Sequence, residues 1–128
     1  MRHPSVLLTA MLIFVSCAES RPTMAEWRVE WDRVSTGVPT QSDVLSDGTR
    51  ATCETGLGLV QKNRVVLLRT PDPAIDDTVA DWLELAHSIY FDCPPPRGFD
   101  DAYATLSRLE AEIDEVIAID LSEDEDAD

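Results

Sequence analysis

Lysine, histidine and cysteine are scarce in this chain of 128 residues. Lys62 is the only lysine, and 10 basic residues stand against 25 acidic ones, which gives a formal net charge of −15. A surface with this charge repels nucleic acid and anionic lipid, so we expect no DNA or RNA partner and no polybasic membrane docking. The same charge attracts a basic protein or a cation.

The sequence also lacks the motifs of common catalytic sites. It contains no GxSxG nucleophile elbow, and its glycines lack the spacing of a phosphate-binding loop. Glu84 and His87 have the Glu-x-x-His spacing of carboxylate-bridged metal sites, but those sites need two such motifs. We therefore predict a protein that is not an enzyme, with no catalytic residue, metal site or cofactor. The alternative is a small secreted hydrolase that uses carboxylates or His87.

The first residues have the organisation of an export signal. The chain starts with Arg2-His3, continues with an uncharged apolar run over residues 6–15 and reaches the small pair Ser16-Cys17. A basic start, a short apolar run and small residues at the exit are typical of a secretory signal. The run is too short to span a bilayer as a stable helix.

The segment Ile13-Phe14-Val15-Ser16-Cys17 resembles the lipobox of bacterial lipoproteins, with Phe14 where leucine is commonest. In that family the chain is cut before the cysteine, whose sulfur then carries a diacylglycerol. The resemblance implies a signal peptide over 1–16, a lipidated Cys17 and a tether over 17–25. The membrane is then a partner through Cys17, and the protein faces the periplasm or the cell exterior.

Two alternatives to the lipoprotein interpretation stay open. Ser16-Cys17-Ala18 also fits a small-x-small cleavage site, and cleavage there removes Cys17 and releases a soluble secreted protein. Translation from Met24 leaves a cytosolic protein instead.

Cys53 and Cys93 form an even pair once Cys17 is assigned to the lipid. Exported chains fold in an oxidising compartment, so we expect a disulfide between them. Two separate cysteines, with one histidine in the mature chain and no CxxC motif, make a poor zinc site.

Apolar periodicity predicts one α+β domain over residues 26–121, a small antiparallel sheet with two C-terminal helices packed on one face. The alternation of Trp27, Val29 and Trp31 with charged residues predicts a strand. The apolar runs 57–60 and 65–68, on either side of a polar turn, predict a buried hairpin.

Two helices are predicted after the hairpin. The first is capped by Asp72, and its apolar stripe consists of Ile75, Val79, Trp82, Leu83, Ala86, Ile89 and Tyr90. The second begins near Gly98 with apolar residues at three- and four-residue steps. Residues 116–121 fit either its last turns or a final strand. The acidic residues 122–128 are predicted to be a disordered tail.

A partial calcium-loop pattern crosses the polar middle of the chain. Asp43, Asp47, Gly48 and Glu54 match four positions of an EF-hand loop, but Leu45 occupies a ligand position. An ordinary Asp-Gly turn accounts for the same residues.

The leading hypothesis is a lipid-anchored binding or structural protein of the bacterial envelope. Its acidic surface suits a basic partner, as in inhibitors and immunity proteins directed at cationic hydrolases. A cation-responsive envelope protein is a further alternative.

Overall fold

A computed structural model describes residues 20–47, 50–93 and 99–126, and regular structure within these ranges is helical throughout. The predicted α+β class is wrong, because none of the described residues forms a strand or sheet. The elements are α2 (Met24–Gly37), α3 (Gln41–Asp47), α4 (Arg50–Leu68), the 3-10 turn η1 (Pro73–Ile75), α5 (Asp76–Phe91) and α6 (Phe99–Asp126).

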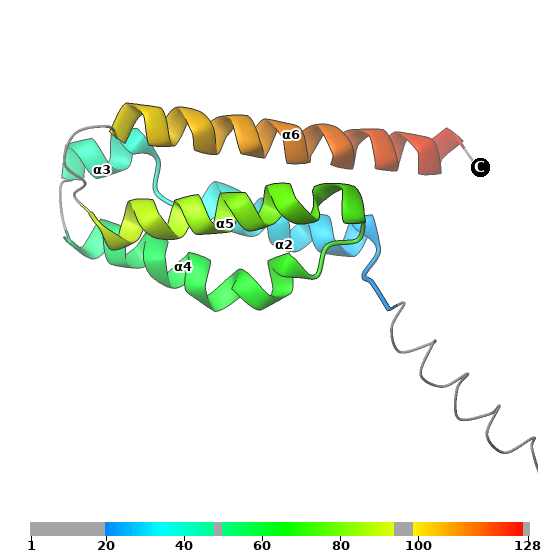
Figure 1. The fold of residues 1–128 in the computed structure, drawn as a ribbon, viewed down its shortest axis with the longest axis horizontal. Coiled ribbons are helices and arrows are strands. Elements are labelled where there is room, and N and C mark those ends of the chain that lie inside the picture. The colour runs from blue at the N-terminus through cyan, green and yellow to red at the C-terminus, as the bar shows by residue number, and fades with distance from the viewer. Residues whose placement is uncertain (1–19, 48–49, 94–98, 127–128) are drawn as a thin grey trace, which may run out of the picture.

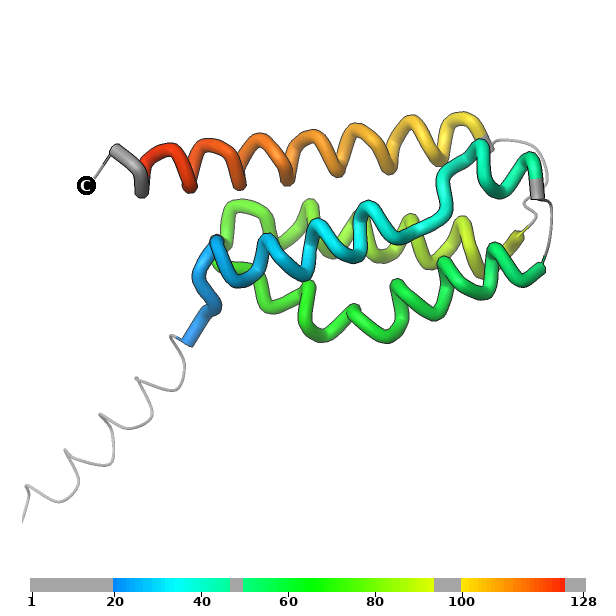
Figure 2. Tube along the Cα trace, turned by 180° about the vertical axis from the view of Figure 1, so that it is seen from behind, coloured from blue at the N-terminus to red at the C-terminus, as the bar shows by residue number. Residues whose placement is uncertain are grey.

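Helices α2, α4, α5 and α6 form an antiparallel bundle (Figure 1). Each packs against two others in the ring α2–α4–α5–α6, so α4 and α6 occupy opposite corners. The short α3 lies at the end of the bundle where α2 ends and α4 begins, and the view from behind in Figure 2 shows the same order. The segment before α2 and the end of α6 lie at the other end.

Helix α2 replaces the strand that the sequence predicted. Thr23 caps it, because its hydroxyl accepts a hydrogen bond from the backbone N–H of Glu26 at 3.2 Å. Trp27 and Trp31 are four residues apart and share the buried face, whereas Val29 points outward and is 61 % exposed. A strand would have placed all three on one face, so this prediction is wrong.

Helix α4 replaces the predicted hairpin. The runs 57–60 and 65–68 belong to one continuous helix, and the residues between them do not form a turn. Its buried positions recur at helical spacing: Cys53, Gly56, Val60, Asn63 and Leu67. Gly56 allows a close approach, because a Cβ atom there would lie 2.7 Å from Cδ1 of Tyr90.

The two C-terminal helices are confirmed. The Asp72 carboxylate accepts a hydrogen bond from the Ala74 N–H at 2.9 Å, and the whole predicted stripe of the first helix is buried. Helix α6 runs to Asp126, so residues 116–121 are helical rather than a strand. Residues 122–126, where the sequence predicted a disordered tail, continue this helix.

Three tryptophans occupy the centre of the bundle. Trp31 of α2 meets Trp82 of α5 edge to face with ring centroids 5.0 Å apart, and it stacks on Trp27 at 5.8 Å. All three indole N–H groups have acceptors, and that of Trp27 donates to the Leu67 carbonyl at 3.0 Å. This bond satisfies a carbonyl in the last turn of α4 that has no partner within the helix.

Candidate functional site

The predicted signal peptide over 1–16 and Cys17 lie outside the described residues, as does the first part of the tether. Among the described helices, none is long and apolar enough to cross a membrane. The tether is bound to the bundle from Arg21 onward. The Arg21 guanidinium donates to the Thr70 carbonyl at 3.1 Å and to the two Asp76 carboxylate oxygens at 3.2 and 3.3 Å.

Asp76 links this contact to the start of α5. Its carboxylate accepts hydrogen bonds from Arg21 and from the Thr70 hydroxyl, and these hold the pKa of Asp76 below its usual range, with Arg21 the larger cause. Thr70 is buried, which fixes the geometry of the contact. The end of the bundle that receives the N-terminal segment is therefore ordered by a buried hydroxyl and an ion pair.

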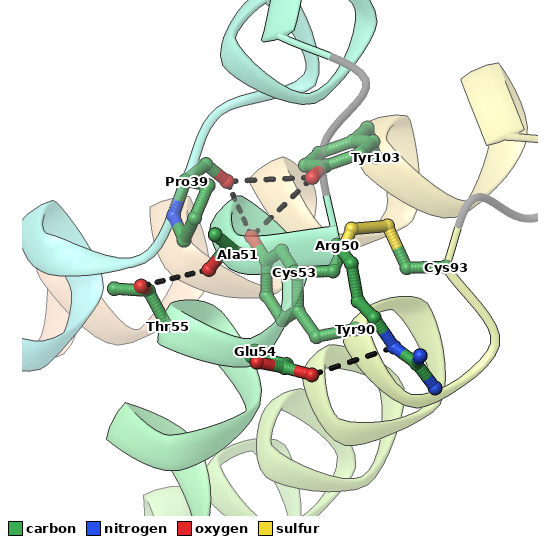
Figure 3. Close-up of a disulfide and its surroundings, with 9 residues drawn as sticks. All are labelled: Pro39, Arg50, Ala51, Cys53, Glu54, Thr55, Tyr90, Cys93 and Tyr103. Atoms are coloured by element: carbon green, nitrogen blue, oxygen red, sulfur yellow. Dashed lines mark hydrogen bonds and ion pairs between the residues drawn. A yellow bond between two sulfur atoms is a disulfide. The ribbon is translucent and has the colours of Figure 1, made fainter.

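The structure joins Cys53 to Cys93 as a disulfide, consistent with the pairing predicted from the sequence (Figure 3). The Cα atoms are 5.9 Å apart, within the usual range for a disulfide. The bridge ties the first turn of α4 to Cys93, two residues after the end of α5. It has a structural position, at the end of the bundle opposite Arg21.

Beside the disulfide, two tyrosines share one backbone acceptor (Figure 3). The Tyr90 hydroxyl donates to the Pro39 carbonyl, and the single proton of the Tyr103 hydroxyl is shared between that carbonyl and the Tyr90 oxygen, each 3.3 Å from the Tyr103 oxygen. Burial is the main cause that raises the pKa of each tyrosine. Both phenols therefore stay protonated at neutral pH, and they pin the segment between α2 and α3 to α5 and α6.

His87 and Glu84 are not brought together into a catalytic or metal-binding group. The His87 ring nitrogen lies 3.4 Å from the Gln61 amide nitrogen and the ring stacks on Phe91, while Glu84 is exposed. In the described part of the chain, no three His, Cys, Asp or Glu side chains are grouped to hold a metal ion.

The calcium-loop residues serve helix ends instead. Asp43 accepts from the Thr40 backbone N–H at 3.0 Å, and the Thr40 hydroxyl accepts from the Asp43 N–H at 3.1 Å. This reciprocal pair is a capping box at the start of α3. Glu54 forms an ion pair with Arg50 on α4. Gly48 and the Asp47 side chain lie outside the described residues.

Two carboxylates of α6 accept hydrogen bonds from core tryptophans, which the sequence did not reveal. Glu110 accepts from the Trp82 indole at 3.0 Å, and Asp114 accepts from the Trp31 indole at 2.8 Å. Burial raises the pKa of Glu110, with the bond from Trp82 acting in the opposite direction.

The charges of the bundle are segregated. Helix α6 carries 11 acidic residues and one basic residue, Arg108, and its outward acids include Asp101, Glu112, Glu115 and Glu123. Helix α4, at the opposite corner, carries three basic residues and one acidic residue. We call the exposed side chains of α6 the acidic face.

The last turns of α4 combine cations with exposed apolar side chains. Val65 is 74 % exposed, Val66 46 % and Leu68 41 %. Exposed cationic side chains lie among them, and we call the whole set the α4 strip: Lys62, Arg64, Val65, Val66, Leu68 and Arg69. Exposed apolar side chains that lie near one another on one helix make this strip a candidate binding surface.

A groove of about 490 Å³ runs beside the α4 strip. Its lining includes Arg21, Pro22 and Trp27 from the N-terminal part of the domain, Val66 of α4, and Arg69, which directly follows α4. Glu26 and Glu30 of α2 also line it, and Glu30 is paired with Arg33 at 2.5 Å. The groove thus joins the N-terminal segment to the α4 strip.

Comparison with known proteins finds no matching family model, no similar curated protein and no similar solved structure.

Proposed function

We propose that this protein is a lipid-anchored binding protein of the bacterial envelope, held by Cys17, that presents the acidic face of α6 to a basic protein. The observation that carries the proposal is the concentration of 11 acids against one arginine on a single long helix. A solubilising surface needs no such segregation, whereas a one-signed face attracts and orients a partner of opposite charge.

The position of α6 supports this assignment. It lies at one corner of the bundle with its outward acids in solvent, so a partner reaches them without unfolding the protein. Two carboxylates of α6, the half-buried Glu110 and the exposed Asp114, accept hydrogen bonds from tryptophans and so link the helix to the core. The helix backbone beneath the acidic face is held by these bonds, which limits the backbone entropy lost on binding.

The binding test uses lysozyme, a basic hydrolase, as the probe. Asp101→Asn, Glu115→Gln and Glu123→Gln together remove three exposed charges from the acidic face. We expect this variant to bind about ten times more weakly, with the loss shrinking in high salt because salt screens the charges. The matched control Glu26→Gln, Glu54→Gln and Asp77→Asn removes three exposed charges from α2, α4 and α5.

The two variants together decide whether the face matters. Equal weakening by both means that only net charge counts and defeats the assignment to α6. No weakening by either means that lysozyme-like partners are the wrong class.

The anchor is tested separately with Cys17→Ala. Several acyl chains hold a lipoprotein on the membrane, so the wild type should enter the detergent phase of a phase-separated extract and the variant the aqueous phase. Mass spectrometry of the N-terminal peptide checks the modification directly. An unmodified Cys17, or a protein that begins at Met24, contradicts the anchor.

A further inference from the structure

The α4 strip has the composition of a surface that lies on lipid. Lys62, Arg64 and Arg69 provide three cations, and Val65, Val66 and Leu68 provide exposed apolar side chains between them. Helices that rest in a membrane interface pair such apolar groups, which enter the headgroup boundary, with cations that meet lipid phosphates.

The N-terminal segment brings the α4 strip to the anchor. Only residues 18–20 separate Cys17 from Arg21, and Arg21 is fixed to Thr70 and Asp76 just beyond the end of α4. Four backbone steps span at most about 14 Å. A lipid on Cys17 therefore keeps the α4 strip within reach of the headgroups, and the groove beside Arg21 is lined by Val65, Val66 and Arg69 of the strip.

The net charge of the protein predicts repulsion from anionic lipid. At the α4 strip, however, the exposed charges are positive and attract it. Neighbouring helix axes lie about 8–10 Å apart, so outward charges on opposite corners of the bundle are roughly 20 Å apart. The Debye length at physiological ionic strength is about 8 Å. The acidic face is thus screened from a surface that touches the α4 strip. The nearest acids in the groove are Glu26 and Glu30, and Glu30 is neutralised by Arg33.

We infer that the α4 strip docks on an anionic phospholipid surface and turns the acidic face of α6 away from the membrane. This inference rests on the proposed anchor at Cys17. It explains why the exposed apolar side chains of α4 gather at the end of the bundle that receives the N-terminal segment. It also gives the acidic face the orientation that a partner in solution requires.

Lys62 provides the readout, because it is the only lysine in the chain. The purified protein is mixed with vesicles of phosphatidylcholine, with or without 30 % phosphatidylglycerol, and treated with a water-soluble acetylating ester. We expect Lys62 to be acetylated several times more slowly on the phosphatidylglycerol vesicles than on the neutral ones. Raising the salt concentration should restore the rate, because screening weakens the contact between the cations and the lipid.

Two variants keep the reporter and change the surface. Arg64→Gln with Arg69→Gln should abolish most of the protection of Lys62, and so should Val65→Ser with Val66→Ser. The matched control Arg28→Gln with Arg108→Gln removes two cations from α2 and α6 and should keep it. Equal loss in the control means that net charge alone decides, and it overturns the docking surface.

Other outcomes are equally decisive. Equal acetylation of the wild type on both kinds of vesicle overturns the inference. Protection that needs no vesicles and grows with protein concentration shows a second copy covering the strip, which also overturns it. An unmodified Cys17 contradicts the anchor alone. In that case, protection of Lys62 by anionic vesicles still supports the docking surface, and a lack of protection contradicts it. The anchor at Cys17 and the docking of the α4 strip can therefore be tested independently.

Discussion

The indole N–H of Trp31 donates a hydrogen bond to the carboxylate of Asp114 at 2.8 Å, which joins α2 to α6 across 83 residues of sequence. Trp31 has no exposed surface, so its N–H group depends on this single acceptor. The bond connects the most buried layer of the core to the helix that carries the acidic face.

Asp114→Ala should lower the free energy of unfolding by about 1–2 kcal/mol, because it leaves the Trp31 N–H without its acceptor. Asp114→Asn keeps a carbonyl oxygen there and should cost clearly less. Urea unfolding measures both, with Glu115→Ala, an exposed neighbour on the same helix, as the control. If both alanine variants lose the same stability, helix propensity rather than the hydrogen bond is responsible.

Glu110 should make the bundle less stable as the pH rises. Burial raises the pKa of Glu110 in the folded state, so its stabilising contribution is complete below the unfolded pKa of about 4.3 and is lost as the pH rises through the folded pKa. Glu110→Gln retains an acceptor for Trp82 and cannot ionise. It should raise Tm at pH 7.

The pH profile is the control for this prediction. The difference in Tm between Glu110→Gln and the wild type should shrink toward zero near pH 4. A lower Tm for Glu110→Gln at pH 7 would contradict the prediction. It would show that the hydrogen bond from Trp82 to the charged carboxylate stabilises the fold by more than burial of that charge costs.

Two glycines of α4 should respond to alanine in opposite directions. A Cβ at Gly56 would lie 2.7 Å and 2.8 Å from Tyr90 ring atoms, and the Tyr90 hydroxyl is tied to Pro39, so the ring cannot retreat freely. We expect Gly56→Ala to destabilise the protein by about 1–3 kcal/mol. A Cβ at Gly58 meets nothing within 4 Å, so Gly58→Ala should stabilise the helix by about 0.5–1 kcal/mol. Denaturant midpoints compare the two, and stabilisation by both variants would contradict the close contact.

The disulfide should contribute a large share of the stability. Cys53 and Cys93 are 40 residues apart, for which the loop-entropy estimate is about 4 kcal/mol. Unfolding with and without reductant should differ by roughly that amount. Mass spectrometry of the alkylated, non-reduced protein identifies the bond, and two alkylated thiols there would contradict it.

The helices α5 and α6 could be predicted because their local signals agree. Asp72 and Pro73 mark the start of the first, and apolar residues at steps of three and four continue through both. Helix α2 could not be assigned from Trp27 and Trp31, because a spacing of four fits the period of a strand as well as that of a helix. The strand was predicted because Val29 is apolar and continues the alternation, but its side chain is exposed and lies outside the core.

Helix α4 was missed because its residues have conflicting preferences. Gly56, Gly58 and the β-branched pair Val65-Val66 favour a strand and a turn, yet Gly56 is required where α4 approaches Tyr90. Packing against α2 and α5 overrides these local preferences. The charge segregation could not be predicted either. It depends on α4 being one helix opposite α6, and the sequence had assigned these residues to a hairpin. The partners of Glu110 and Asp114 lie on other helices, where local patterns carry no information.

The order of the helices around the ring has a consequence for how fast the chain can fold. Three of the four interfaces, α2–α4, α4–α5 and α5–α6, join helices that follow one another, and only α2–α6 closes across the length of the domain. Bundles with such local connectivity fold in microseconds to milliseconds, because little loop entropy is lost before packing begins. We expect the first three bundle helices to associate early and α6 to close the ring last. The interval during which Trp31 and Trp82 lack the carboxylates of α6 is then short.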